Sequence, residues 1–288
     1  PFLFSGSIPS FTDAFFETMS GFTTTVASIL NDIESLPKSI LFWRSFTQWI
    51  GGLGIIVISM ALLPVFGFSS VQVFSAEATG PTKDKIHPKM NETAKRLLVI
   101  YISLTLIETI LLKIAGMNWF DAVNHAFTTM ATGGFSTKQA SIGYWDSALI
   151  QYIIIVFMIF AGVNFSIYYY VMKARLDKIR VNEEFRYYLL ITLVSTLLIL
   201  TSILPENDIL SFSSIELAFR DSLFTVSSLI TTTGYVTADY DLWKPVTWII
   251  LLITMMMGAS AGSTAGGIKT VRIVIIAKYC YYEFKRIV

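Results

Sequence analysis

Residues Asp221-Ser-Leu-Phe-Thr-Val-Ser-Ser-Leu-Ile-Thr-Thr-Thr-Gly-Tyr235 form a short apolar stretch that ends in a Thr/Gly-rich run. Two earlier stretches align with it, Asp13-Ala-Phe-Phe-Glu-Thr-Met-Ser-Gly-Phe-Thr-Thr-Thr-Val-Ala27 and Asp121-Ala-Val-Asn-His-Ala-Phe-Thr-Thr-Met-Ala-Thr-Gly-Gly-Phe135. Each predicts a half-helix with an acid near its N-terminus, which complements the helix dipole, and then a loop that cannot continue the helix. The chain is therefore expected to repeat one structural unit three times.

Apolar segments of bilayer length separate these stretches. Of the 288 residues, 54% are hydrophobic and 14% charged, and the mean hydropathy is +0.64. Soluble domains average roughly 25% charged residues, so this composition is typical of a membrane protein. At about 20 residues per crossing, five segments are long enough to span a bilayer. They are 40–63, 97–116, 147–171, 187–204 and 246–279. We predict an all-α integral membrane protein.

Charge alternates between the two sides of these spans. Most basic residues fall within 83–96, 173–186 and 269–286, whereas the segments between them are rich in acids. By the positive-inside rule the basic segments face the cytoplasm, which predicts a multi-pass protein of the cell membrane. Trp43, Trp145 and Trp243 begin spans on the acidic side, as interfacial anchors do. Segments 117–145 and 205–244 start and finish outside, so their short apolar stretches predict re-entrant helices.

The Thr/Gly-rich runs have the composition of a cation filter on the outer side. Successive backbone carbonyls can replace the hydration shell of an ion, and glycine permits the backbone angles that this requires. The predicted ligands are carbonyl oxygens for K⁺ or Na⁺, with no transition metal and no tightly bound cofactor. They belong to Thr24, Thr25, Val26 and Ala27, to Thr132, Gly133, Gly134 and Phe135, and to Thr232, Thr233, Gly234 and Tyr235.

The last apolar segment is too long for one regular helix. Small residues interrupt it, and non-helical backbone at membrane depth survives only where it lines a cavity or is packed in protein. We predict a break near 258–267. Its candidate residues are Gly258, Ser260, Gly262, Ser263, Thr264, Gly266 and Gly267, with Lys269 just below. The alternative is that the glycines are close contacts between helices and that Lys269 snorkels to the cytoplasm.

Other functions find less support. A net charge of +1 argues against nucleic acid, and the single cysteine, Cys280, excludes an internal disulfide framework. Gly258-Ala-Ser-Ala-Gly262 matches the nucleophile elbow of serine hydrolases. That site needs a preceding strand and a nearby base, whereas His87 and His125 are expected in a cytoplasmic loop and a half-helix. We predict no enzyme activity.

Six motifs together resemble the Trk/Ktr potassium-uptake family, specifically its Trk-type membrane subunits, and the resemblance covers essentially the whole chain. They are Ser20-Gly-Phe-Thr-Thr-Thr25, Arg44-Ser-Phe-Thr-Gln-Trp-Ile-Gly-Gly-Leu-Gly-Ile-Ile56, Phe120-Asp-Ala-Val-Asn-His-Ala-Phe-Thr-Thr129, Thr132-Gly-Gly-Phe-Ser136, Thr231-Thr-Thr-Gly-Tyr235 and Gly262-Ser-Thr-Ala-Gly-Gly-Ile-Lys269. The resemblance implies four units around one pore and a gating loop at 258–267 beneath the filter. It also implies a homodimer and a cytosolic nucleotide-binding regulatory subunit.

The chain departs from the family pattern in two ways. Residues 1–66, 67–180 and 181–288 correspond to units one to three, without the first span of unit one and without unit four. We therefore expect a piece of a longer polypeptide. Val26 also stands where the family has glycine. A β-branched residue with positive φ is strained, so either the first loop takes another shape or its K⁺ over Na⁺ selectivity is weakened.

A coupled secondary transporter is the alternative function, because broken helices at mid-membrane also form substrate sites in such proteins. Carriers usually place ionisable groups at that site. The candidates for such groups within the predicted spans are Glu108, Lys113 and Lys269. Glu108 has a functional and a purely packing interpretation, and both stay open.

Overall fold

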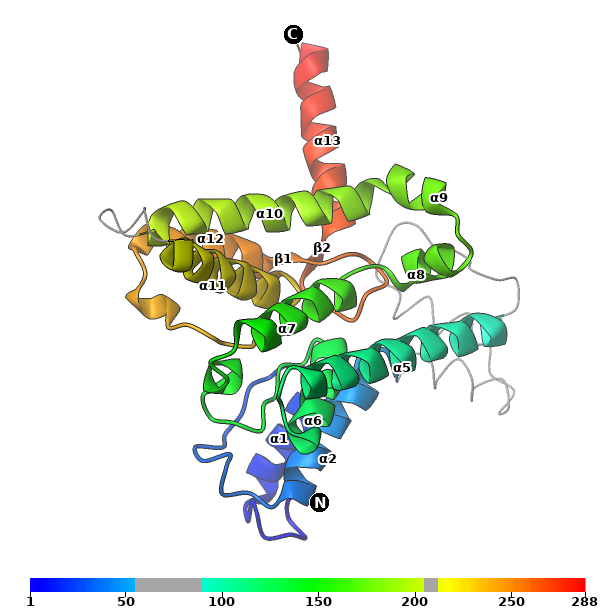
Figure 1. The fold of residues 1–288 in the computed structure, drawn as a ribbon. Helices are drawn as coiled ribbons and strands as arrows, with labels where there is room; N and C mark the ends of the chain where they lie inside the picture. The colour runs from blue at the N-terminus through cyan, green and yellow to red at the C-terminus, as the bar shows by residue number, and fades with distance from the viewer. Residues whose placement is uncertain (55–89, 205–211, 288) are drawn as a thin grey trace.

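The computed structural model describes residues 1–54, 90–204 and 212–287 (Figure 1). Two pairs of neighbouring helices open the described chain: α1 (Phe11–Phe22) with α2 (Lys38–Trp49), which runs into the π-helical turn η1 (Ile50–Gly54), and then α5 (Met90–Ile114) with α6 (Trp119–Met130). The following elements are η3 (Ser141–Tyr144), α7 (Ala148–Ala161), α8 (Phe165–Met172), α9 (Leu176–Val181), α10 (Glu183–Ile203) and α11 (Phe212–Ile230). The last are η4 (Tyr240–Leu242), α12 (Pro245–Met256), β1 (Met257–Gly258), β2 (Ile268–Lys269) and α13 (Thr270–Ile287).

Among the residues that the structure describes, two helices each meet the length and hydropathy of a membrane span. They are α5 over Lys95–Ile114, with a mean hydropathy of 2.1, and α10, with 1.6. These confirm the predicted spans 97–116 and 187–204. Of the predicted span 40–63, the structure shows α2 and η1 up to Gly54, and the remainder lies outside the described residues.

The predicted span 147–171 is not one continuous helix. Helices α7 and α8 together have the length and hydropathy of a span, but they are bent by 97° at the break between them. The cause is local. Gly162 caps the end of α7, and the side chain of Asn164 accepts a hydrogen bond from the Ser166 amide, which starts a new helix. A side chain at Gly162 would also collide, since its Cβ would lie 3.0 Å from the Cβ of Ala259.

The predicted break in the last apolar segment is confirmed. Helix α12 ends at Met256 and α13 begins at Thr270, with a loop between them. Strands β1 and β2 flank this loop as a parallel pair, in which Met257 faces Ile268 and Gly258 faces Lys269. In Figure 1 the helix α13 projects away from the remaining helices.

Helices α1 and α6 are the predicted half-helices. Each has 12 residues, about 18 Å at 1.5 Å per residue, which is too short for a bilayer core of ~30 Å. Their side-chain caps are Ser10 and Asn118, which accept from the amides of Asp13 and Asp121 in the first turn.

The third half-helix differs from the prediction. Helix α11 has 19 residues and starts at Phe212, so Asp221 lies in its middle and not near its N-terminus. Residues 212–220 contain no glycine or proline that would delay the helix, and the aspartate therefore does not mark its start.

The second unit packs between the other two. Helix α6 contacts α2 as well as α5 and α7, and α7 also contacts α11, which in turn packs on α10 and α12. In Figure 1, α1, α2 and α6 form one end of the molecule, and α10 to α12 form the other. The loops that follow α1, α6 and α11 are thereby brought together.

Candidate functional site

All three half-helices end in the same hydrogen-bonded turn. After α1 the amide of Thr24 donates to Gly21 O at 3.1 Å and that of Thr25 to Ser20 O at 3.0 Å. The equivalent pairs after α6 are Thr132 to Thr129 and Gly133 to Thr128, and after α11 they are Thr232 to Leu229 and Thr233 to Ser228. This is the Schellman motif, in which the residue that follows the helix cap is left-handed and is usually glycine.

Here threonine occupies that left-handed position three times. The φ angles are 53° at Thr24, 51° at Thr132 and 55° at Thr232. A β-branched residue rarely adopts this conformation, and it costs of order 1–3 kcal/mol. The same strain at three equivalent positions marks a shape that the surrounding structure imposes, as is common at functional sites.

Two residues further on, the backbone is left-handed again. The φ angles are 71° at Val26, 71° at Gly134 and 80° at Gly234. Of the two alternatives for Val26, the structure therefore shows that the loop keeps the shape of its glycine counterparts. Valine bears the steric strain, and no other backbone form relieves it.

The three loops meet one another. A Cβ atom added to Gly134 would lie 1.8 Å from the carbonyl oxygen of Thr233, and one added to Gly234 would lie 3.4 Å from both methyl carbons of Val26. The first approach admits only glycine, because real Cβ atoms do not come so close to backbone oxygen. The structure thus brings together the twelve residues that the sequence predicted as one group.

Most carbonyls of this group lack a protein partner. Gly133 O accepts from Gln48 Nε2 at 2.7 Å, and Tyr235 O accepts from the Ser228 hydroxyl at 2.7 Å. Among the described residues, no hydrogen bond reaches the other ten of the twelve carbonyl oxygens. Thr132 and Thr233 are fully buried, at 1% and 0% exposure. Thr25, Ala27 and Gly234 are exposed, so the set is partly open to solvent. Neighbouring carbonyls without a protein donor are suited to binding a cation.

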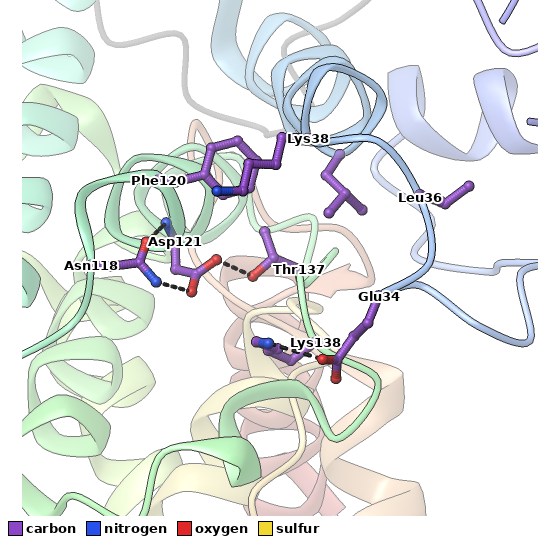
Figure 2. A pocket seen from close by; sticks show the side chains of 9 residues that line it. Glu34, Leu36, Lys38, Asn118, Phe120, Asp121, Thr137 and Lys138 are labelled. Carbon is purple, nitrogen blue, oxygen red and sulfur yellow. Dashed lines mark hydrogen bonds and ion pairs between the residues drawn. The ribbon is translucent and has the colours of Figure 1, made fainter.

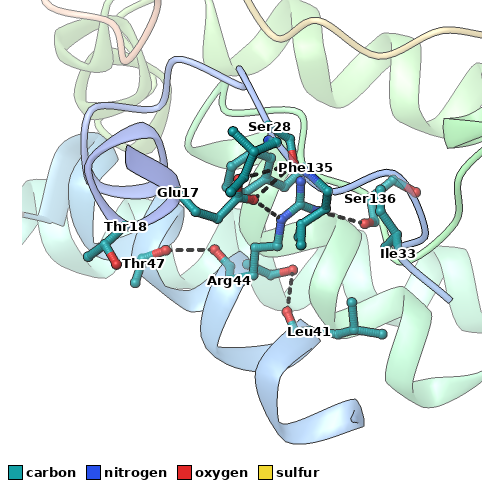
Figure 3. A network of polar contacts seen from close by, with 12 residues as sticks. Glu17, Thr18, Ser28, Ile33, Leu41, Arg44, Thr47, Phe135 and Ser136 are labelled. Atoms are coloured by element: carbon teal, nitrogen blue, oxygen red, sulfur yellow. Dashed lines mark hydrogen bonds and ion pairs between the residues drawn. The ribbon is translucent and has the colours of Figure 1, made fainter. Parts of the chain in front are cut away.

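A buried ion pair between α1 and α2 contacts residues at the ends of the first two loops (Figure 3). Arg44 Nε of α2 lies 2.7 Å from Glu17 Oε1 of α1, with side-chain exposures of 3% and 0%. The Glu17 carboxylate also accepts from the Ser28 hydroxyl at 3.0 Å, just after the first loop. Arg44 Nη1 donates to Ser136 O at 3.1 Å, and the guanidinium carbon lies 3.6 Å from the centre of the Phe135 ring. This ion pair therefore fastens the ends of both loops.

A second set of contacts joins the loops after α6 and α11. The Nε2 atom of His125 lies 3.0 Å from the Ser136 hydroxyl, and Nδ1 lies 2.8 Å from Asp121 O. The Tyr235 hydroxyl donates to His125 O at 3.2 Å and also hydrogen-bonds the Thr128 hydroxyl. The side chain of Gln48 adds a third clamp, since its Oε1 accepts from the Phe135 amide at 3.0 Å.

Sequence reasoning did not predict these supporting residues. An ionisable group in an apolar helix is a signal of function, and it would have identified Glu17 and Arg44. The same signal applies to His125, whereas Gln48 is uncharged, and its contacts with Gly133 and Phe135 could not be read from its own helix.

The residues of the predicted break lie beside these loops. The amide of Gly266 donates to the Thr232 hydroxyl at 2.7 Å, and the Thr264 hydroxyl donates to Met130 O, at the end of α6, at 3.1 Å. The amide of Ala261 donates to a carboxylate oxygen of Glu184, in the first turn of α10, at 2.6 Å. The loop is therefore fastened both to the half-helix ends and to the start of a span.

The packing alternative for this segment is wrong. Gly258, Gly262, Gly266 and Gly267 all lie outside helices, so they make no helix-to-helix contact of the small-residue kind. Lys269 is 6% exposed and its ammonium donates to Ala265 O, so it does not snorkel.

The remaining candidates are the residues of the hydrolase alternative and of the carrier alternative. Ser260 Oγ makes no hydrogen bond within the described part of the chain, and both ring nitrogens of His125 are engaged elsewhere, so no hydrolytic pair exists there. His87 lies outside the described residues. Glu108 is fully buried in α5, whereas Lys113 lies 5.8 Å from the Trp119 ring centre. Among the described residues, no ion pair joins Glu108, Lys113 and Lys269.

A cavity of about 390 Å³ lies next to the second loop (Figure 2). Its acids are already engaged. Asp121 accepts from the Thr137 hydroxyl and from the Asn118 amide, both at 2.6 Å. Glu34 lies 2.9 Å from Lys138 Nζ, and this hydrogen bond raises the pKa of Lys138 above its usual value. The cavity therefore lies between the segment that follows α1 and residues near the two ends of α6.

Half-helices that end in neighbouring loops of one shape, packed among apolar helices of span length, are typical of integral membrane proteins. Comparison with known proteins specifies the family. Residues 1–287 match the family TrkH, described as cation transport protein, and the chain belongs to it. The predicted resemblance to Trk-type subunits is thereby confirmed, and the relatives below are transport proteins, not enzymes.

Relatives and a solved structure agree with this assignment. The chain is 41% identical to the Trk system potassium uptake protein TrkH of Escherichia coli (strain K12), over 100% of this chain and 60% of that protein. It is 35% identical to TrkG of the same strain, over 96% of this chain and 57% of that protein. The crystal structure of the potassium transporter TrkH from Vibrio parahaemolyticus matches with a TM-score of 0.81 and 37% identity, over 96% of this chain and 56% of that chain. The chain thus spans about 60% of the length of these relatives.

Glu17→Gln is expected to destabilise the protein by about 3–5 kcal/mol, because it leaves the Arg44 guanidinium buried without a counter-charge. Ser28→Ala is the matched control, since it removes a neutral hydroxyl that donates to the same carboxylate and accepts from the Leu30 amide, and leaves both charges in place. It is expected to cost about 1–2 kcal/mol. Thermal unfolding of the detergent-solubilised complete polypeptide measures both. Equal melting temperatures for Glu17→Gln and the unmodified protein would contradict the role of the ion pair.

Proposed function

We propose that the chain forms part of a potassium-uptake protein in which the loops 24–27, 132–135 and 232–235 supply three of the four strands of a selectivity filter. The observation that carries this proposal is the set of ten carbonyl oxygens without a protein donor, on three loops of one shape. The relatives that are named potassium uptake proteins support K⁺ as the ion. In this proposal the units are 1–66, 67–180 and 181–288 of a pseudo-fourfold pore.

The filter works by exchange of ligands. A K⁺ ion that enters from outside loses water and gains carbonyl oxygens, which restore its coordination without a large barrier. The half-helices point their C-terminal ends at the loops, and the partial negative charge of those ends favours a cation. Gly133 and Tyr235 already bond to Gln48 and Ser228, so the other ten carbonyls make the ion contacts. The membrane potential contributes about 2.3 kcal/mol for each elementary charge and each 100 mV. This free energy suffices to drive inward flow of cations.

The proposal includes a membrane location and partners. The basic segments lie in the cytoplasm and the filter faces outward, as the positive-inside rule predicts. A homodimer and a cytosolic nucleotide-binding regulatory subunit complete the assembly in this view. Both follow from the family resemblance, and chemical crosslinking of the complete polypeptide in membranes tests the first.

Gly134→Ala is expected to abolish selective K⁺ uptake, because the new Cβ would collide with Thr233 O at 1.8 Å. Gly234→Val is expected to weaken selectivity by at least about tenfold, through crowding against Val26 and strain at its positive φ. Gly116→Ala is the matched control, since Gly116 also has a positive φ but has no atom within 4 Å of the added Cβ. Rates of K⁺ and Na⁺ uptake in a transport-deficient host are the measurement. Unchanged K⁺ uptake after both filter glycines are replaced would refute the assignment.

Val26→Gly is expected to raise the K⁺/Na⁺ permeability ratio and to stabilise the protein by about 1–3 kcal/mol, since glycine adopts a φ of 71° without strain. In the proposal Val26 makes the natural filter more permeable to Na⁺. Ala27→Gly is the control, because the neighbouring position has no positive φ to relieve. A permeability ratio that is the same before and after the change would show that position 26 does not set selectivity.

We also propose that the loop 258–267 is the gate. It touches the filter at Thr232 and the end of α6 at Met130, so it lies where it can block the path below the filter. The buried ammonium of Lys269 adds positive charge at this level and raises the barrier for cations. Hinge residues with free backbone angles, such as Gly262 and Gly267, let such a loop swing aside.

Glu184→Ala is expected to increase ungated cation flux severalfold, because it removes the acceptor that holds the Ala261 amide. Glu183→Ala is the matched control, since the neighbouring carboxylate pairs with the exposed Lys278 and makes no contact with the loop. Deletion of residues 260–265 is expected to increase flux further. Flux through vesicles that contain the complete polypeptide measures all three, and a fall in flux with the protein folded and inserted argues against a gate.

A further inference from the structure

A groove lies at one end of the membrane span formed by α5, where the last turn of α8 packs beside it. Its volume is about 410 Å³. Helix α5 supplies Lys95, Arg96 and Val99, and the end of α8 supplies Tyr169, Met172 and the adjoining Lys173. None of these residues belongs to the filter, the gate or the contacts that support them.

The charge of the groove has one sign. Of the described residues that line it, three are basic and none is a carboxylate. The cations stand on both walls, with Lys95 and Arg96 on α5 and Lys173 just after α8. The guanidinium of Arg96 also lies 5.2 Å from the centre of the Tyr169 ring, which directs it toward the opposite wall. Such an arrangement attracts an anion that fits between two helices.

The groove also has an apolar part at a defined depth. Lys95 is the first residue of the span Lys95–Ile114, so Val99 lies one turn inside it. Val99 and Met172 are 56% and 71% exposed. A soluble anion would neutralise the cations and leave these side chains uncovered, and an acidic protein on the cytoplasmic side would not reach them. A phospholipid contacts both, with its phosphate at the cations and an acyl chain along the apolar wall.

We propose that this groove binds an anionic phospholipid of the cytoplasmic leaflet. The phosphate lies between Lys95 and Lys173, and one acyl chain covers Val99 and Met172. The orientation follows from the basic segments that flank both helices and does not depend on whether the loops form a filter.

The experiment uses the complete polypeptide in phosphatidylcholine nanodiscs and measures its affinity for fluorescent phosphatidylglycerol. The double variant Lys95→Gln/Lys173→Gln is expected to weaken binding about thirtyfold, at roughly fivefold for each basic residue removed near the membrane surface. Arg272→Gln/Lys285→Gln is the matched control, because it removes two charges of α13 outside the groove. It is expected to leave the affinity within twofold.

Further variants keep the outcome decisive. Lys95→Arg/Lys173→Arg retains the charge and is expected to bind as the unmodified protein does, which excludes misfolding as the cause of a loss. Equal weakening by the groove and α13 doubles would show a general surface charge effect and overturn the proposal. Glycerol phosphate that competes as tightly as the lipid would assign the groove to a free phosphate. If the double variant Lys95→Gln/Lys173→Gln lost binding of an acidic cytosolic protein while its lipid affinity stayed unchanged, the groove would be assigned to a protein partner.

Discussion

The ion pair between Glu17 and Arg44 is the interaction on which the arrangement of the loops depends. Burying two charges is costly, and the cost is offset only where each partner fills its remaining hydrogen-bonding capacity. The Ser28 hydroxyl donates a further hydrogen bond to the carboxylate of Glu17. The guanidinium of Arg44 donates to Ser136 O and stacks on the Phe135 ring. All these partners lie on or next to the loops. The charges are therefore stable only when the loops are in place, and the loops hold their strained angles only when the charges are paired.

Helix α6 connects this ion-pair network to the third loop. Helix α6 presents His125 to the loop of its own unit and Thr128 to Tyr235 of the third, so a single half-helix positions two loops. Polar contacts of this kind are directional, whereas apolar contacts between helices allow them to slide. The apolar helices place the loops near one another, and the buried polar contacts set their final register.

Local signals in the sequence were sufficient for a large part of this description. The repeat that ends at Gly134 and Gly234 and the small residues of 258–267 each mark their structure within a few positions, so the loops and the break could be predicted. The bend at Gly162 could not, because the apolar run around it has the hydropathy of a continuous span. The sequence placed the start of α11 near Asp221 by alignment with the other two aspartates, whereas the helix begins at Phe212. The contact between Arg44 and Ser136 joins residues far apart in the chain, and the φ angle of Val26 depends on such contacts.

The two helix breaks, at 162–164 and 257–269, complete each other's backbone. Gly162 O accepts from the Ser260 amide at 3.0 Å, and Gly262 O accepts from the Phe165 amide at 3.1 Å. A backbone group without a partner in lipid costs several kcal/mol. During synthesis the earlier break emerges long before its partner, and until then those groups lack the donor and acceptor that they finally use. The break at 162–164 therefore gains these backbone partners only after residues 257–269 have been synthesised.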